Sequence, residues 1–492
     1  MALAGPGVRG PPADLEALPS TRVRRTKIVA TVGPASREPE VLRRLVEAGM
    51  DVARLNFAHG TYEQHAETAD RIRQAAGAVG RQVAILQDLP GPKLRIGPLE
   101  NDFAELGTGD HLTLTAGDGD GSLGNAECMS VSWDGLAEAM EPGEILYLAD
   151  GAVRLRTESV RAAEGEIDTV VEIGGTVASR QGLNIPGELA DLPALPEEDL
   201  AGLRFGLEIG VDLVGVSFVR RPEDITEVRE HTRTPLIAKI EKPQAVESIE
   251  AIVQASDCVM VARGDLGIEL PIEEVPIVQK QVIGMAGALA RPVITATQML
   301  DSMVTSSRPT RAEVTDVANA ILDGTDAVML SQETAVGSHP IEAVSMMARI
   351  AERTEQIAPY EQWNERRVRR DQRDPAYTIA HNACSGVRQL GLAAIICPTL
   401  SGRSARLISA HRPEVPVYAL SPGKETVRRC GLMWGVQAAS MRRCETTEQL
   451  IADAARRVLE LGWAKRGDRV GITAGLPSGT PGTTSLFQVQ EL

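Results

Sequence analysis

The sequence predicts an α/β protein whose core is a (β/α)8 TIM barrel, a closed ring of eight parallel strands with a helix after each. Short apolar segments rich in β-branched residues alternate with amphipathic helical segments, the pattern of parallel strands joined by crossover helices. Eight such units can close into a barrel that leaves no exposed edge. Polar residues gather where several strands end, and such barrels carry their chemistry there. An open, doubly wound sheet is the alternative.

The first units of this alternation precede residue 90. We expect strands at 27–33, 52–57 and 83–88. Two helices lie between them, one ending near Gly49 and one covering 62–80. The residues before the first strand are rich in Gly, Pro and Ala and contain no apolar signal-peptide core, so we expect a flexible tail at 1–24.

A different pattern occupies residues 90–186. Short strands are separated by turns rich in Gly, Asp and Asn, and no long helical pattern occurs. The expected strands cover 112–115, 145–148, 153–156 and 169–172. This stretch is predicted to be a small all-β barrel, inserted into the larger barrel as a lid domain.

The strand–helix alternation then resumes, so the barrel domain comprises 25–89 and 187–358. The expected strands are 213–218, 236–241, 258–265, 292–299 and 327–333. The expected helices are 197–210, 222–231, 244–255, 272–290, 310–323 and 340–356. A separate C-terminal α/β domain follows at 371–492. Its expected strands are 393–397, 415–420, 470–473 and 486–490, with helices at 377–390, at 402–411 and in two further segments before residue 470.

Composition narrows the class of function. The chain has 492 residues, enough for about three domains, and a formal net charge of −16 without a long basic tract, which argues against nucleic-acid binding. Anionic substrates would therefore need local cationic pockets. The six cysteines show no CxxC spacing, which favours reduced thiols in the cytoplasm over disulfides or a zinc site. No apolar run approaches the ~18–20 residues of a membrane span, so we expect no membrane partner.

Two charged residues stand at the end of a strand that is otherwise apolar. Strand alternation puts Lys239 and Glu241 on one side of the chain. The next strand leads into Asp265, and parallel neighbours would bring the two carboxylates together. Because Mg²⁺ takes one or two carboxylates and leaves positions for substrate oxygens, the pattern predicts a Mg²⁺ site beside a lysine. A buried Lys–Glu ion pair without chemistry is the alternative.

Further polar residues follow other strand ends of the predicted barrel. They are Arg54, Asn56, His59, Asp88, Lys93, Arg95, Gly264, Thr297, Arg311, Glu313 and Thr315. Cations around two carboxylates suit phosphoryl transfer between anions, because like charges at ~4 Å repel by roughly 4 kcal/mol at an effective dielectric constant of ~20. Gly264, which has no side chain, would let a ligand approach the backbone closely. For any one of these residues taken alone, a surface ion pair is the simpler interpretation, whereas the whole set at one rim of the barrel favours chemistry.

Several segments closely resemble the pyruvate kinase family. They are 26–36, 52–60, 238–241, 260–267, 296–300, 311–313 and 316–319. The resemblance spans 26–333 and, more weakly, the C-terminal domain. It implies transfer of the phosphoryl group of phosphoenolpyruvate to ADP, giving pyruvate and ATP in the last step of glycolysis. It also implies Mg²⁺ or Mn²⁺ as the cofactor, a cytoplasmic location and a homotetramer.

The resemblance assigns roles to the phosphoenolpyruvate side of the site. Lys239 would stabilise the transferring phosphoryl group, and Arg54 would hold phosphate. Glu241 and Asp265 would hold the metal. The remaining groups assigned by resemblance are the Gly264 backbone and Thr297 for the carboxylate side of phosphoenolpyruvate, Thr297 and Thr315 for the proton relay to the enolate, and Asn56, His59 and Arg95 for the nucleotide.

The chain departs from the family at the monovalent-cation site. Asn56 and Asp88 remain, but Ala58 replaces a serine that supplies a K⁺ ligand, and Leu89 replaces a threonine. Lys93 stands where K⁺-dependent members carry glutamate. Our hypothesis is that the Lys93 ammonium replaces the monovalent cation, so that K⁺ is not required.

A second departure concerns the end of the lid. The family commonly has lysine immediately before a glycine there, whereas this chain has Arg180 followed by Gln181. We expect Arg180 to reach the nucleotide phosphates, with Gln181 as the competing contact.

The C-terminal domain carries an expected effector site. The segment 399–404 follows a strand and opens a helix, an arrangement that binds anions, and it resembles the family's phosphate-binding effector loop. The residues are Ser401, Gly402, Arg403 and Ser404. The segment 473–482 corresponds to the family's mobile loop. We expect activation by a phosphorylated sugar or nucleotide; a plain helix cap is the alternative.

Two other functions fit parts of the pattern. An enolate lyase or aldolase on a related Mg²⁺ barrel would share Lys239, Glu241 and Asp265. The inserted lid and the cations at its entry favour a second phosphorylated substrate instead. A sugar-phosphate sensor without enzymatic activity would not need Lys239, Glu241, Asp265 and Thr297, all of which are present.

Overall fold

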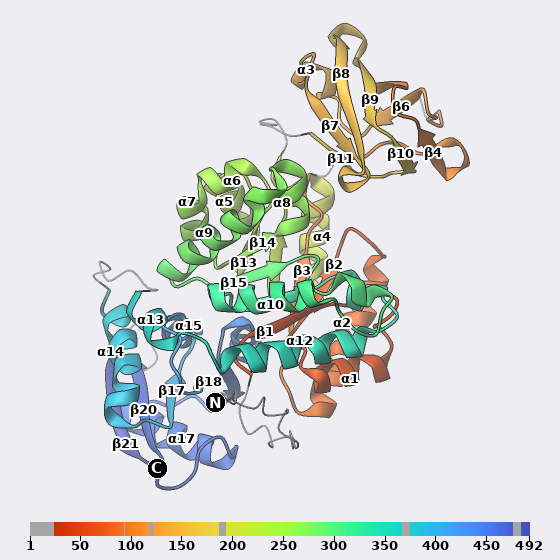
Figure 1. The fold of residues 1–492 in the computed structure, drawn as a ribbon. Helices are drawn as coiled ribbons and strands as arrows, with labels where there is room; N and C mark the ends of the chain where they lie inside the picture. The colour runs from red at the N-terminus through yellow and green to blue at the C-terminus, as the bar shows by residue number, and fades with distance from the viewer. Residues whose placement is uncertain (1–23, 93, 118–121, 186–192, 367–373, 476–483) are drawn as a thin grey trace, which may run out of the picture.

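The computed structural model describes residues 24–92, 94–117, 122–185, 193–366, 374–475 and 484–492 (Figure 1). The expected tail lies outside these residues except for Arg24. The elements form three groups, because the insert interrupts the barrel after β3 and the C-terminal domain follows the barrel. The insert and the C-terminal domain lie at opposite ends of the central barrel (Figure 1). None of the helices in the described ranges is long and apolar enough to cross a membrane.

Eight parallel strands form the closed barrel, which confirms the predicted fold class over an open sheet. In spatial order they are β1 (Lys27–Thr31), β16 (Ala327–Leu330), β15 (Val293–Ala296), β14 (Cys258–Ala262), β13 (Leu236–Ile240), β12 (Leu213–Val216), β3 (Ala84–Asp88) and β2 (Val52–Asn56). Most of their residues are buried, because helices cover the outside of the ring and side chains fill its interior.

The helices around the barrel begin and end at recognisable signals. They are α1 (Pro39–Ala48), α2 (Tyr62–Val79), α4 (Glu197–Glu208), α5 (Pro222–His231), α6 (Pro243–Glu247), α7 (Ile249–Ala255), α8 (Arg263–Glu269), α9 (Val275–Ala288), α10 (Arg311–Asp323), α11 (Gln332–Ala335) and α12 (Pro340–Glu355). Thr61 and Thr310 form capping boxes at the starts of α2 and α10, and Gly80 and Gly324 end them in the left-handed conformation.

The barrel differs from the sequence prediction at several places. The strand expected at 327–333 ends at Leu330, and the short helix α11 begins at Gln332. The strand expected at 258–265 ends at Ala262, and α8 begins at Arg263, so Asp265 lies in the first turn of a helix, where a negative charge is favourable. The strand expected at 292–299 ends at Ala296, before two residues with positive φ. The helix expected at 244–255 is two helices, α6 and α7, that meet at Ser248.

The insert is an all-β domain. Its six-stranded sheet has the order β11 (Leu183–Asn184), β7 (Ile145–Leu148), β8 (Val153–Arg161), β9 (Glu166–Ile173), β5 (His111–Ala116) and β6 (Cys128–Val131). Segment 94–97 joins the two edges of this sheet through backbone hydrogen bonds. On the β11 side, the Leu94 carbonyl accepts from the Leu183 N–H and the Ile96 N–H donates to the Gln181 carbonyl; on the β6 side, the Gly97 N–H donates to the Ser130 carbonyl. The remaining elements are β4 (Phe103–Leu106), β10 (Gly175–Ala178) and the short helix α3 (Leu136–Ala139).

The C-terminal domain contains one five-stranded sheet. Its order is β19 (Val436–Ser440), β18 (Val417–Ser421), β17 (Ala394–Pro398), β20 (Arg469–Gly475) and β21 (Thr484–Glu491). Strand β19 is missing from the sequence prediction, because its residues, VQAAS, lack the β-branched run on which that prediction depended. The helices described in this region are α13 (Tyr360–Arg366), α14 (Pro375–Leu390), α15 (Arg403–Ala410), α16 (Lys424–Arg429) and α17 (Thr447–Glu460).

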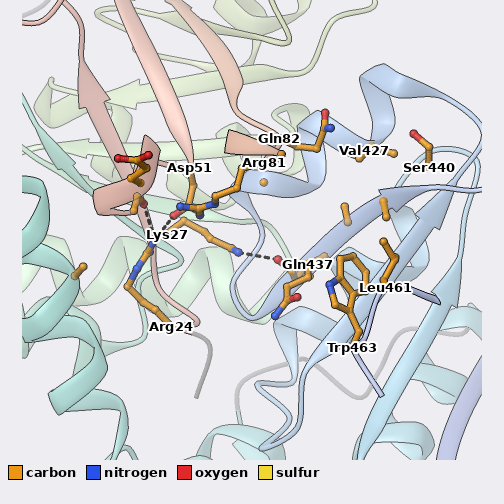
Figure 2. A pocket seen from close by; sticks show the side chains of 18 of the residues that line it. Arg24, Lys27, Asp51, Arg81, Gln82, Val427, Gln437, Ser440, Leu461 and Trp463 are labelled. Atoms are coloured by element: carbon orange, nitrogen blue, oxygen red, sulfur yellow. Dashed lines mark hydrogen bonds and ion pairs between the residues drawn. The ribbon is translucent and has the colours of Figure 1, made fainter. Parts of the chain in front are cut away.

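The C-terminal domain packs against the amino ends of the barrel strands. The Nη1 of buried Arg412, from the C-terminal domain, lies 2.7 Å from Oδ1 of Asp326, which directly precedes β16. Lys27 Nζ, at the start of β1, donates a 2.7 Å hydrogen bond to the Val436 carbonyl of β19. Between the two domains lies a pocket of about 770 Å³, in which Arg24 and Arg81 face Asp51 from the barrel side (Figure 2). This contact leaves the carboxyl ends of the strands free for the lid.

Candidate active site

The predicted site lies at the carboxyl ends of the barrel strands. Strands β13 and β14 are parallel neighbours, with Lys239 opposite Met260, so their carboxyl ends are adjacent. Strands β2 and β3 are also neighbours, with Asn56 opposite Asp88. The closed ring therefore brings side chains from separate units of the sequence to one mouth.

Lys239 is held by three oxygen atoms. Its Nζ lies 2.9 Å from Glu241 Oε1 and 3.3 Å from Asp88 Oδ1, and it donates a 2.7 Å hydrogen bond to Ser217 Oγ. Burial alone would lower the pKa of Lys239, but the charges of the two carboxylates outweigh burial and raise that pKa above its ordinary value. The ammonium is therefore fixed in place and charged at neutral pH.

Asp88 joins this lysine to Arg54. The Arg54 Nε lies 2.6 Å from Asp88 Oδ2, and Arg54 Nη1 donates a 3.0 Å hydrogen bond to Thr31 Oγ1. Burial would raise the pKa of Asp88, but Lys239 and Arg54 lower it below its ordinary value. One fully buried carboxylate thus orients two cations at the mouth of the barrel.

Glu241 is buried directly after β13. Its Oε2 accepts a 2.7 Å hydrogen bond from the Phe218 backbone, and Oε1 has no partner within the described ranges apart from the Lys239 ammonium. Burial raises the pKa of Glu241 to about 7; Lys239 acts against this rise and the charge of Asp265 adds to it. Asp265 is therefore near enough to repel Glu241.

The chemistry of these two carboxylates suits a divalent cation. Glu241 Oε1 is a buried acceptor with spare capacity, and a cation would relieve the repulsion from Asp265. Across the described ranges, no three His, Cys, Asp or Glu side chains gather into a metal site. A metal held here would take its other ligands from substrate or water, as Mg²⁺ commonly does.

Gly264 and Thr297 meet beside the two carboxylates. The Gly264 N–H donates a 2.7 Å hydrogen bond to Thr297 Oγ1, and Thr297 has φ 69°. A Cβ built on Gly264 would find its nearest neighbour, Thr297 Oγ1, at 3.5 Å, which is ordinary contact. The protein itself therefore does not require glycine there, whereas a ligand approaching the backbone would.

Two side chains that the sequence analysis did not select complete this part of the site. Ser217 accepts from Lys239 and donates a 2.7 Å hydrogen bond to the Leu89 carbonyl. Arg263 lies 2.6 Å from Asp316 Oδ2 and donates a 2.7 Å hydrogen bond to the Thr297 carbonyl. A polar residue that directly follows an apolar strand, as both do, is the signal that could have found them.

The expected nucleotide residues fall in two places. Arg95 and Arg180 lie together in the lid, where Arg95 Nη1 donates a 3.1 Å hydrogen bond to the Arg180 carbonyl. Asn56 remains at the barrel mouth, and its Oδ1 accepts from the Ala58 N–H at 3.2 Å. The loop that follows it carries His59, whose carbonyl is 3.0 Å from His65 Nε2.

The remaining residues expected at the site are Arg180 with Gln181, Thr315 and Lys93. Gln181 Oε1 accepts a 2.8 Å hydrogen bond from the Ala178 N–H, so this side chain is used within its own turn, while Arg180 is exposed. The Thr315 hydroxyl is exposed on α10 and donates a 2.9 Å hydrogen bond to the Arg311 carbonyl. Lys93 lies outside the described residues.

The expected effector loop precedes α15. Gly402 has φ 83° and donates a 3.0 Å hydrogen bond to Thr399 Oγ1. Arg403 forms an ion pair with Asp374, and Ser404 Oγ lies 2.5 Å from Thr484 Oγ1. Ser401 is exposed in the same loop, and residues 476–482 of the expected mobile loop lie outside the described ranges.

The closed barrel, with cationic side chains and buried carboxylates gathered at the carboxyl ends of its strands, is the architecture of a (β/α)8 barrel enzyme. The sequence matches the family description "Pyruvate kinase, barrel domain" over residues 23–344 and "Pyruvate kinase, alpha/beta domain" over residues 377–490. The chain belongs to the pyruvate kinase family.

Individual relatives agree with this assignment. The chain is 43% identical to a pyruvate kinase from Geobacillus stearothermophilus over 95% of its own length and 80% of the relative. It is 44% identical to pyruvate kinase 2 from a Synechocystis strain, over 95% of its own length and 79% of the relative. A crystal structure of a pyruvate kinase from Cryptosporidium parvum matches with a TM-score of 0.88 at 34% identity, covering 95% of this chain and 96% of that one.

Proposed function

We propose that this enzyme transfers the phosphoryl group of phosphoenolpyruvate to ADP, giving pyruvate and ATP. The observation that carries the proposal is the Lys239 ammonium, held between the carboxylates of Glu241 and Asp88 at the barrel mouth. The bond between phosphorus and the enol oxygen breaks, and a bond from phosphorus to a terminal ADP oxygen forms. The enolate left behind takes a proton at its methylene carbon.

The side chains at the mouth would share this work. Lys239 stabilises the charge on the transferring phosphoryl group, and Arg54 holds its oxygens. The Gly264 backbone and Thr297 bind the carboxylate end of phosphoenolpyruvate. Thr297 and Thr315 supply the route for the proton. The nucleotide is held by Asn56, His59, Arg95 and Arg180.

Glu241 and Asp265 would hold Mg²⁺ or Mn²⁺. When bound, the metal neutralises phosphate charge and orients the phosphate oxygens. The two carboxylates leave most of its coordination positions to other ligands, which suits a cation shared with a substrate. The lid, which carries Arg95 and Arg180, would exclude water that competes for the phosphoryl group.

We further propose that the enzyme does not require K⁺. Ala58 lacks the hydroxyl that the family's K⁺ site uses, and Lys93 supplies a positive charge in this part of the sequence. The residues Ser401 to Ser404 would bind a phosphorylated sugar or nucleotide as an activator. A homotetramer and a cytoplasmic location are proposed from the family resemblance.

The decisive experiment measures pyruvate release by the purified chain. Phosphoenolpyruvate and Mg²⁺ are supplied with and without ADP, and with a chelator as control. Release that needs both ADP and the metal supports the proposal. Release that is independent of ADP would mean that water accepts the phosphoryl group. An absence of release in every mixture would indicate a lyase, an aldolase or a sensor in place of a phosphotransferase.

A further inference from the structure

A second buried lysine directly follows the proposed metal ligand Glu241. Lys242 lies between β13 and α6 and is only 9% exposed. Its Nζ is 2.5 Å from Glu269 Oε1 and donates a 3.3 Å hydrogen bond to the Ile185 carbonyl. Because a buried ammonium is unfavourable unless it is paired, these contacts fix the side chain in one place.

Glu269 connects this lysine to the helix of the site. It is the last residue of α8, whose first turn carries Gly264 and Asp265. Its side chain is 1% exposed. Burial raises its pKa, while the charge of Lys242 acts against that rise. An ion pair at one end of a two-turn helix limits how the other end can rotate.

Ile185 connects the same lysine to the lid. It follows β11, whose Asn184 pairs with Tyr147 of β7, and its side chain is buried in the core of the insert. A second contact lies nearby, because a Cβ built on Gly151 of the insert would be 3.5 Å from Ile268 of α8. The returning chain of the lid thus meets α8 at the Lys242–Glu269 pair.

We propose that Lys242 and Glu269 are positioning residues that hold the lid in register with the helix carrying Asp265. The proposal rests on the function proposed above. In that scheme the lid brings Arg95 and Arg180 to the nucleotide, while α8 presents a metal ligand. Loss of the ion pair would therefore raise KM for ADP more than it lowers kcat.

The experiment compares Lys242→Met, Glu269→Gln and the double variant with wild type. Lys280→Met serves as the matched control, because Lys280 pairs with Asp323 on the exposed barrel surface. We expect KM for ADP to rise roughly tenfold in each single variant, with a smaller change in kcat. In the double variant the rise in KM for ADP should be smaller than the two single effects combined. The conservative variant Lys242→Arg, which keeps a positive charge, should have a KM for ADP close to that of wild type.

Hydrogen exchange at Leu183 and Asn184 gives a measurement that does not depend on turnover. We expect faster exchange at both amides in Lys242→Met and no change in Lys280→Met. If the wild type shows no ADP-dependent release, the proposed function fails, yet the exchange result still reports on the pair. If both KM and exchange in Lys242→Met and Glu269→Gln match the control, the inference is wrong. Should Lys242→Met not fold, Glu269→Gln, which keeps the side-chain shape, decides.

Discussion

The ammonium of Lys239 lies 2.9 Å from the carboxylate of Glu241, and their side chains are only 12% and 0% exposed. Buried pairs of this kind add little to stability, because losing two hydration shells offsets their attraction. Two apolar residues would fill the end of β13 as well. The charges are therefore better explained by a ligand that needs a cation and an acceptor at one point.

Replacing Lys239 with methionine should abolish most turnover without unfolding the chain. The phosphoryl group would lose its fixed cation, so we expect kcat to fall by at least about 10²-fold. Arg54 still compensates Asp88, and Glu241 can take up a proton because its pKa lies near 7. Circular dichroism should match wild type. Lys280→Met is the control, and retained turnover in Lys239→Met would contradict the assignment.

Asp199 should make stability depend on pH. Burial raises its pKa from 3.8 to about 6, although its Oδ2 accepts a 2.7 Å hydrogen bond from Gly91. The folded state therefore binds the extra proton more readily, and the resulting stability, complete below pH 3.8, is lost as pH rises through 6. Asp199→Asn keeps an acceptor for Gly91 without the charge.

We accordingly expect Asp199→Asn to be more stable than wild type by about 2 kcal/mol at pH 7.5, with the difference vanishing near pH 4. Paired thermal unfolding at both pH values measures this. A variant that is less stable than wild type at pH 7.5 would show that the carboxylate is compensated.

Turnover should not need K⁺. In a buffer whose only monovalent cation is tetramethylammonium, we expect the wild type to keep its activity, because Lys93 supplies the charge. Lys93→Glu should lose roughly tenfold or more in kcat. Adding K⁺ should restore activity best in the Ala58→Ser/Lys93→Glu variant, which regains the missing hydroxyl. A large loss in wild type that K⁺ restores would overturn the hypothesis.

Effector binding should compete with the ion pair between Arg403 and Asp374. A ligand phosphate at the start of α15 would take the place of the carboxylate. Arg403→Ala should therefore abolish activation by sugar phosphates or nucleotides at low phosphoenolpyruvate. Asp374→Asn, which keeps the cap of α14, should tighten activation about threefold. Saturation curves that no candidate shifts, in wild type or variants, would mean the loop is only a helix cap.

The fold could be predicted because its signals are local. Apolar strands and the capping boxes at Thr61 and Thr310 can be recognised in the sequence itself. Lys239 and Glu241 can be recognised as a pair because residues two apart on an extended chain point to the same side. The hydrogen bond from Lys239 to Ser217 cannot be recognised in this way, because it depends on how two neighbouring strands are aligned. The first turn of α8 is assigned to the strand in the sequence prediction because Arg263, Gly264 and Asp265 directly follow the apolar run of β14 without a turn signal.

Arg263 is the clearest case of a residue whose role only the fold reveals. Its guanidinium joins α8 to α10 through Asp316 and supports Thr297, a residue held at φ 69°, through the carbonyl. Lysine cannot reproduce this planar, two-sided contact. We expect Arg263→Lys to raise KM for phosphoenolpyruvate roughly tenfold, because Thr297 and the Gly264 N–H would no longer be held in place. Initial rates at saturating ADP measure this; a KM equal to that of Lys280→Met would show that Thr297 keeps its place without Arg263.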